Sequence, residues 1–132
     1  MRAPDTSVLV AALASWHEHH GPAASAIPGC ALIGHTAVEL VSVLTRLPEP
    51  HRIEGSIVAT FLEDTFDDSP LVLPAVELRT LPRHLIDLGV TGGAIYDGLI
   101  AATARHFGAT LITLDERAVR TYERLGVGHT AP

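Results

Sequence analysis

The chain has 132 residues, 47% of them hydrophobic, which predicts one domain with a core of its own. Its formal net charge of −6 argues against a nucleic-acid partner unless bound cations offset the acids. All nine basic residues are arginine, so P-loop, Schiff-base and Ser-Lys chemistry are excluded, as are receiver domains and haloacid-dehalogenase-type phosphatases.

Cysteine usage and hydropathy predict a compartment. Cys30 is the only cysteine, which rules out an internal disulfide and fits a reducing cytosol. No secretory signal precedes the first expected element, because an acid stands at position 5, and no apolar run reaches the roughly 18 residues of a membrane span. We therefore expect a single cytoplasmic domain over residues 1–132 without a membrane segment, and a buried, unreactive Cys30.

The first half of the chain predicts strands and helices in alternation. Leu9, Ala12, Leu13 and Trp16 recur at helical spacing behind a short opening strand, and Pro48 ends a later helix. The expected elements are a strand at 2–5, a helix at 7–15, a short helix or turn at 22–27, a strand at 30–33, and helices at 36–46 and 53–66.

The second half continues the alternation. The expected elements are a strand at 71–73, a helix at 75–88 interrupted by Pro82, a helix at 94–107, a strand at 110–113, a helix at 116–125 and a marginal strand from Val127. The short strands are apolar without polar alternation, which is typical of a parallel sheet buried on both faces. The pattern therefore predicts an α/β fold.

Two acids follow expected strands and precede helices. Asp5 comes after the first strand and Asp115 after the strand at 110–113. Parallel α/β sheets place their ligands at the carboxyl ends of the strands, so both acids are candidate site residues. Each could instead cap the helix that follows, although Thr6 or Ser7 would serve equally well as the cap next to Asp5.

Two further acids lie within expected helices among apolar residues. Glu39 stands between Val38 and Leu40, and Asp97 occupies the first turn of a helix rich in small residues. A lone carboxylate in such a setting is costly, and a hard divalent cation is a suitable partner. The alternatives are a solvent-facing Glu39 and an Asp97 that only complements its helix dipole.

Taken together, these segments resemble the PIN-domain ribonucleases, specifically the VapC toxins of bacterial toxin–antitoxin pairs. The resemblance covers the whole chain and is carried by "DTSVLVAAL", "HTAVELVSVLTRLP" and, most specifically, "GVTGGAIYDGLIAATARHFGATLITLDERA". It implies a three-layer α/β/α PIN-like domain with a short central parallel sheet of four to five strands. It also implies a catalytic, metal-binding set made of Asp5, Glu39, Asp97 and Asp115, with Thr6 and Thr113 in support.

The resemblance further implies what the protein acts on and binds. The expected activity is Mg²⁺-dependent endoribonuclease, with Mn²⁺ as an alternative metal, on an RNA substrate such as a tRNA or rRNA loop. The expected partners are a cognate VapB-type antitoxin and a second copy in a homodimer. A non-catalytic RNA- or partner-binding module and a non-toxin RNA-processing nuclease remain the competing functions.

Other polar residues were weighed for the same site. Five arginines are candidates for phosphate contact: Arg46, Arg83, Arg105, Arg117 and Arg120. The histidines of "HEHH" at 17–20 lack the further ligands that a tetrahedral metal site needs, so we expect them at a helix terminus or on a surface loop. His35 is expected to do no more than cap the helix that carries Glu39.

Overall fold

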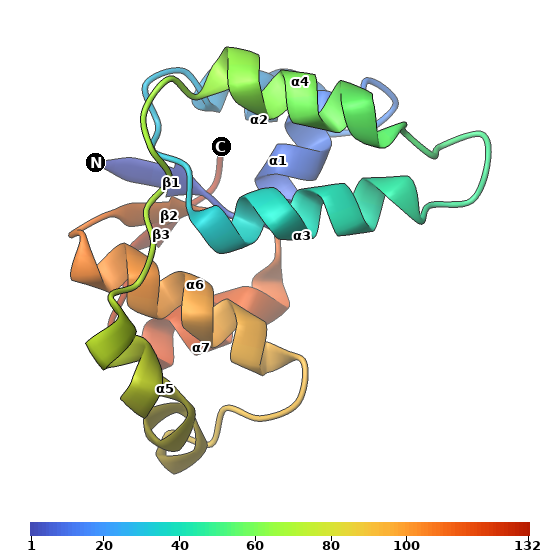
Figure 1. Cartoon of the computed structure of the whole chain (residues 1–132). Helices are drawn as coiled ribbons and strands as arrows, with labels where there is room; N and C mark the ends of the chain where they lie inside the picture. Colours follow the sequence, from blue (N-terminus) through green and yellow to red (C-terminus); the bar gives the residue numbers. More distant parts are fainter.

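A short parallel sheet forms the centre of the computed structural model, which describes all 132 residues. It contains β1 (Arg2–Pro4), β2 (Thr110–Ile112) and β3 (His129–Thr130) in that spatial order. Ala3 lies opposite Leu111, which in turn lies opposite His129. The two ends of the chain therefore meet in one sheet (Figure 1), and both edges of β2 are paired.

Seven helices surround this sheet. They are α1 (Thr6–Leu13), α2 (His20–Ala26), α3 (Gly34–Thr45), α4 (Gly55–Thr65), α5 (Ala75–Asp87), α6 (Ala94–His106) and α7 (Glu116–Arg124). Helices α1 to α4 lie on one side of the sheet and α5 to α7 on the other (Figure 1). The α/β fold with three layers is thereby confirmed.

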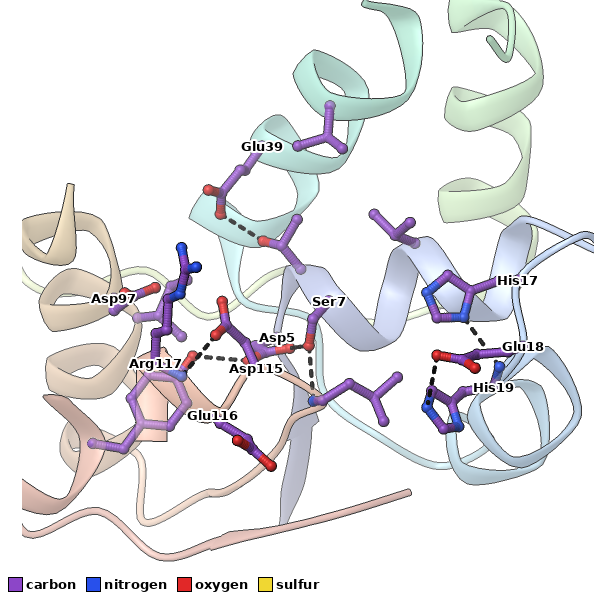
Figure 2. A pocket seen from close by; sticks show the side chains of 16 residues that line it. Asp5, Ser7, His17, Glu18, His19, Glu39, Asp97, Asp115, Glu116 and Arg117 are labelled. Atoms are coloured by element: carbon purple, nitrogen blue, oxygen red, sulfur yellow. Dashed lines mark hydrogen bonds and ion pairs between the residues drawn. The ribbon is translucent and has the colours of Figure 1, made fainter. Parts of the chain in front are cut away.

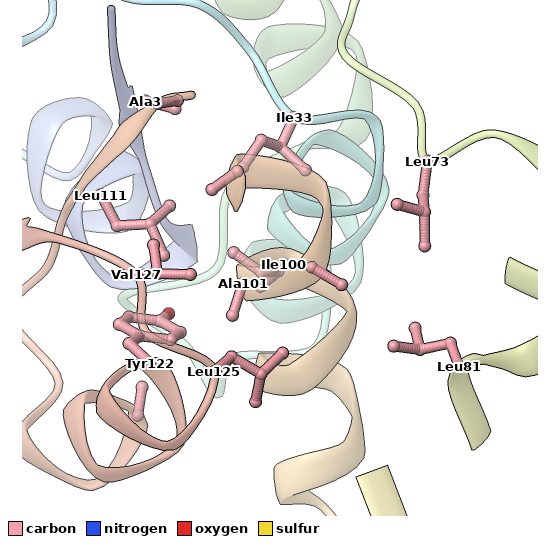
Figure 3. Packing of buried hydrophobic residues seen from close by; sticks show 14 of the residues in the cluster. Ala3, Ile33, Leu73, Leu81, Ile100, Ala101, Leu111, Tyr122, Leu125 and Val127 are labelled. Atoms are coloured by element: carbon pink, nitrogen blue, oxygen red, sulfur yellow. The ribbon is translucent and has the colours of Figure 1, made fainter. Parts of the chain in front are cut away.

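Each face of the sheet has its own hydrophobic core. Leu111 of β2 joins a cluster formed with α5, α6 and α7, and Figure 3 shows its side chain beside Tyr122 and Val127. Its neighbour Ile112 belongs to the other cluster, formed with α1 to α4. Successive strand residues point to opposite faces, so a strand between two cores needs apolar residues at consecutive positions. The absence of polar alternation in the sequence has this cause.

The sheet is shorter than the four to five strands expected. The segments at 30–33 and 71–73 contribute a single isolated parallel bridge, between Ile33 and Leu71. Helix α3 already begins at Gly34, and prolines at 70 and 74 flank the second segment. Pro70 has no N–H to donate before Leu71, and beyond Leu71 the partner segment has already turned into α3, so the pairing is confined to this bridge.

Two further expectations change in detail. Pro82 does not interrupt α5, which runs continuously through it, because this exposed face lets water solvate the carbonyl that loses its partner. Cys30 is partly rather than fully buried; its thiol donates to the Ala26 carbonyl over 3.2 Å, and burial raises its pKa, which disfavours the reactive thiolate. No helix has the length and apolar character needed to cross a bilayer.

Candidate active site

The four acids selected from the sequence line one cleft of about 690 Å³. They come from four places in the fold: Asp5 from the end of β1, Glu39 from α3, Asp97 from the first turn of α6 and Asp115 from the start of α7. Figure 2 shows their carboxylates around a single opening. Residues as far apart in sequence as 5 and 115 are thus brought together by the fold.

Strand pairing sets the positions of Asp5 and Asp115. β1 and β2 are adjacent and parallel, so both chains leave the sheet at the same edge, and the Asp5 N–H donates to the Ile112 carbonyl over 2.9 Å. The loop after β2 is tied to α1 as well, because the Leu114 N–H donates to Ser7 Oγ over 2.9 Å. These backbone bonds hold the two strand ends, and the acids on them, in a fixed relation.

Asp5 is a buried carboxylate held by several donors. Only 2% of the residue is exposed; it accepts hydrogen bonds from the hydroxyls of Ser7 and Tyr122, the latter over 2.9 Å, and from the Val8 N–H. Burial raises the pKa of Asp5, while these donors and the Thr113 hydroxyl act in the opposite direction. Asp5 therefore caps α1 itself, rather than leaving the cap to Thr6 or Ser7, and also faces the cleft.

Asp115 likewise combines the two roles that the sequence left open. One carboxylate oxygen accepts from the N–H groups of Arg117, over 2.9 Å, and Ala118, over 3.3 Å, which caps α7. The residue still lines the cleft. Thr113 supports the turn, since its hydroxyl accepts from the Asp115 N–H over 3.0 Å. Capping and a place in the site are compatible because a carboxylate has two oxygens.

Glu39 is not a free surface residue. Its side chain is 34% exposed and accepts a hydrogen bond of 2.5 Å from the Thr6 hydroxyl. The His35 ring lies one turn earlier, with Nε2 3.8 Å from Glu39 Oε2, and stacks on Tyr96 at a centroid distance of 5.5 Å. His35 Nε2 is buried without a hydrogen-bond partner, so polar capacity at this wall of the cleft is unsatisfied by the protein alone.

The pKa of Asp97 reflects its burial and the nearby charges of the other three acids. Its pKa is raised from 3.8 to about 6, first by burial and then by the charges of Asp115, Glu39 and Asp5. No arginine forms an ion pair with any of the four. The cleft therefore concentrates negative charge that the protein does not neutralise.

The four carboxylates share the cleft without closing on a common point. No three His, Cys, Asp or Glu side chains stand close enough to hold one ion between them. The hydrogen bonds explain this: Glu39 is held by Thr6, Asp115 by the start of α7 and Asp5 by Tyr122 and Ser7. Mutual repulsion of like charges favours the same separation.

The chain is similar in sequence to known proteins. The PIN domain matches residues 3–124 of the chain. This chain belongs to the PIN-domain family. It is 54% identical over 128 residues to Ribonuclease VapC40 of Mycobacterium tuberculosis, with 96% of each chain covered, and 41% identical over 127 residues to Ribonuclease VapC27 of the same species, with 95% and 92% covered.

A solved structure supports the fold of this PIN domain. The crystal structure of FitAcB from Neisseria gonorrhoeae superposes with a TM-score of 0.70 and covers 100% of this chain and 98% of the other. The sequence identity is 21%, so this likeness concerns the fold alone. The expected resemblance to VapC proteins of the PIN family is confirmed.

Sequence reasoning missed two supporting residues of this PIN domain. Tyr122 is fully buried and donates to Asp5 from α7, more than a hundred positions away, and Ser7 links Asp5 to the loop after β2. Ser7 had a local signal, since it lies two residues from an acid. Tyr122 had none, because its spacing from other α7 residues predicts only a buried core position.

The surroundings of the cleft also differ from expectation. Of the five arginines considered, only Arg117 lines it, while Arg83 and Arg105 line a separate cleft between α5 and α6. The segment at 17–20 is indeed outside a helix apart from His20, yet His17, Glu18 and His19 line the cleft of the four acids. Which arginines and which histidines line the cleft depends on the topology of the fold and on burial. The local spacing of residues in the sequence determines neither of these.

Proposed function

We propose that this PIN domain is a metal-dependent endoribonuclease of the toxin type, acting in the cytoplasm. The observation that carries the proposal is the meeting of four carboxylates, from four separate elements, in one cleft without an arginine partner. The names of the relatives at 54% and 41% identity, which are ribonucleases, support the same activity.

The chemistry of the cleft fits a hard divalent cation. Carboxylate oxygens are the ligands that Mg²⁺ and Mn²⁺ prefer, and a bound cation would relieve the repulsion that raises the pKa of Asp97. The side chains must shift toward one another, which their positions on the rim of one cleft allow.

We assign roles to the four acids on this basis. Asp5, Glu39 and Asp97 would hold the first ion, and Asp115 would complete the site directly or through water. Thr6 orients Glu39, and Thr113 orients the turn that presents Asp115. The metal, when bound, supplies an activated water and offsets charge on the phosphodiester transition state. The expected products carry a 5′-phosphate and a 3′-hydroxyl.

Cleavage of total RNA tests the activity. Brief expression followed by mapping of new 5′ ends should reveal cut sites in tRNA or rRNA loops that are absent with Asp97→Asn. In vitro, excess EDTA should abolish cleavage while circular dichroism shows a folded protein, because the two cores do not depend on a metal. Undiminished cleavage in EDTA, or equal activity of Asp97→Asn, would refute metal-dependent catalysis by these acids. Absence of cleavage by the parent protein would leave a non-catalytic binding module as the function.

The proposal includes two protein partners. A cognate VapB-type antitoxin would lay a basic segment across the acidic cleft, where its arginine would complement the uncompensated carboxylates. A second copy would form a homodimer. Deleting the basic residues of the antitoxin tail should release the activity, and unchanged inhibition would contradict the charge-based contact.

A further inference from the structure

The cleft continues past the four acids to a second end that the proposed chemistry does not use. Val10 of α1 and Val43 of α3 also line it. His17, Glu18 and His19 line the end away from the four acids (Figure 2). The eight residues of α1 rise roughly 12 Å between the two ends. Side chains at the far end are therefore too distant to act on the bond that is cut, although they line the same cleft as the four acids.

Aromatic rings gather at this far end. Trp16, the only tryptophan of the chain, is 46% exposed, and its ring centroid lies 4.4 Å from that of His51 and 5.9 Å from that of His17. His17 in turn lies 5.8 Å from His19. Of this group, His17 and His19 line the cleft itself, and the half-exposed Trp16 packs against His17 and leaves aromatic surface open there. We call these four residues, Trp16, His17, His19 and His51, the aromatic platform.

Local hydrogen bonds fix part of the platform before any ligand arrives. The His19 N–H donates to His17 Nδ1 over 3.1 Å, which places the proton of a neutral His17 ring on Nε2. The next residue, His20, bonds through its ring to the Ala11 carbonyl over 2.9 Å and anchors the turn to α1. A preorganised platform loses less conformational entropy on binding than mobile side chains would.

The charge of the cleft explains why such a platform is needed. Six acids line it, and Arg117 is the only arginine: the acids are Asp5, Glu18, Glu39, Asp97, Asp115 and Glu116. Attraction to phosphates, which dominates the affinity of most nucleic-acid-binding proteins, is therefore weak here. Stacking of bases on aromatic rings does not depend on that attraction, and contributes to the binding of every type of base.

We propose that the aromatic platform is a subsite that stacks an unpaired nucleobase of the RNA, a short way along the strand from the bond that is cut. The inference rests on the proposed ribonuclease function and narrows its substrate class. Bases of a duplex are stacked on their neighbours and cannot present a free face, so the substrate must be single-stranded over this stretch, as in a loop.

Trp16 provides its own spectroscopic probe. In the Asp97→Asn protein, which should not cut its ligand, stacking of a base should quench the tryptophan fluorescence on addition of oligouridylate or oligoadenylate. A matched abasic ribose-phosphate strand carries the same phosphates without bases and should leave the fluorescence unchanged. Quenching that is equal with the abasic strand, or absent with both base-carrying strands, would overturn the subsite.

Cleavage kinetics give a second readout. Trp16→Ala should raise the KM for an unstructured RNA oligonucleotide roughly tenfold with kcat nearly unchanged, because a distant stacking contact binds substrate and transition state alike. Trp16→Phe keeps an aromatic face and should lie between Trp16→Ala and the parent. Phe107→Ala is the matched control, since Phe107 is also exposed and packed against a histidine, His106, but that histidine does not line the cleft. This substitution should change neither parameter.

The outcomes separate this inference from the proposed function. Quenching by base-carrying strands together with the rise in KM supports the platform. Cleavage by the parent protein with unaltered KM in Trp16→Ala overturns the platform and leaves the ribonuclease function intact. Base-dependent quenching in a protein that cuts no RNA supports the platform and refutes the nuclease. If Trp16→Ala weakens binding of the antitoxin but leaves RNA binding unaltered, the base-stacking subsite is overturned. The aromatic platform would then be a contact surface for the antitoxin.

Discussion

The chemistry of the cleft depends on how single side chains are held. Asp5 is almost completely buried, and its charge is stabilised by donors from two parts of the chain: Ser7 and the Val8 N–H in α1, and Tyr122 in α7. Asp97 lacks such donors and is surrounded by like charge instead. The two carboxylates are therefore held differently: Asp5 is fixed by its donors, and Asp97 is the acid whose protonation we expect to respond most to a cation.

Stability of the metal-free protein should depend on Asp97 in a defined pH range. The folded-state pKa of Asp97 is about 6 against 3.8 for an unperturbed carboxyl, so the native state binds the proton more tightly than the unfolded state. The free energy of unfolding should consequently fall as pH rises from 3.8 to about 6 and level off above that. In the presence of a chelator, Asp97→Asn should not show the loss of stability that Asp97 causes as pH rises. The free energy of unfolding of Asp97→Asn, relative to that of the parent protein, should therefore increase between pH 3.8 and about 6. Parallel denaturation profiles for the two proteins would refute this.

Tyr122 should be a positioning residue for Asp5. Burial and the Asp5 charge raise the pKa of Tyr122, so its hydroxyl remains a donor at neutral pH. Tyr122→Phe removes that donor from a buried carboxylate and should lower the free energy of unfolding by about 1–3 kcal/mol in urea denaturation. It should also raise the Mg²⁺ concentration needed for half-maximal cleavage. Tyr96→Phe is the control, because its exposed hydroxyl makes no hydrogen bond and both readouts should stay at parent values.

At the scale of elements, close packing of α6 on α5 sets the position of Asp97. Gly98 lies directly after Asp97, and a Cβ built on it would come within 2.7 Å of both terminal methyl carbons of Leu85. Leu85 is itself buried in the core, with 1% exposure. Only a residue without a side chain allows α6 to approach α5 at this point. The small residues after Asp97 therefore have a packing role in addition to any contact with substrate.

Gly98→Ala tests this packing. Alanine favours a helix, but the clash with a buried leucine should outweigh that gain and lower stability by about 1–2 kcal/mol in thermal or urea denaturation. Cleavage should fall as well, because α6 carries Asp97. Gly93→Ala at the start of the same helix meets nothing within 4 Å and should be neutral. Leu85→Val should recover part of the stability in the Gly98→Ala background, and a failure to do so would argue against the contact.

For the whole molecule, exposed apolar side chains on α4 and α5 indicate where a second copy would bind. Ile57 of α4 is 52% exposed, and Val76 and Ile86 of α5 are 75% and 52% exposed. Single exposed hydrophobic residues are ordinary, but such residues on α4 or on α5, which lie on opposite sides of the sheet, are candidate contacts for a partner. This observation supports the homodimer that the resemblance implies.

Light scattering after size exclusion tests the dimer. The parent chain should elute with twice the mass of the 14.0 kDa protomer. Val76→Glu and Ile57→Glu should shift it toward the monomer, because burying a carboxylate in an apolar contact is costly. Phe107→Glu introduces the same charge outside these helices and should remain dimeric. A parent chain that is monomeric at every concentration would refute the assembly.

Much of this protein follows from the sequence by itself. Consecutive apolar residues such as Leu111 and Ile112 in "TLIT", between helical patterns, indicate a parallel sheet with two covered faces, since neighbouring residues of a strand point to opposite faces. The positions of Asp5 and Asp115 behind strands, and the long C-terminal motif around Asp97, were sufficient to select the acids and the family.

Other features were decided only by the tertiary structure. The donor from Tyr122 to Asp5, the continuation of the cleft to His17 and the choice of Arg117 among the arginines all depend on which elements lie side by side in space. The sheet ended after three strands because prolines and an early helix start limited pairing at its edge. The spacing of apolar residues along the sequence predicts whether a segment is a helix or a strand. Contacts between distant elements depend on how the whole chain packs, so they cannot be predicted from any one short segment.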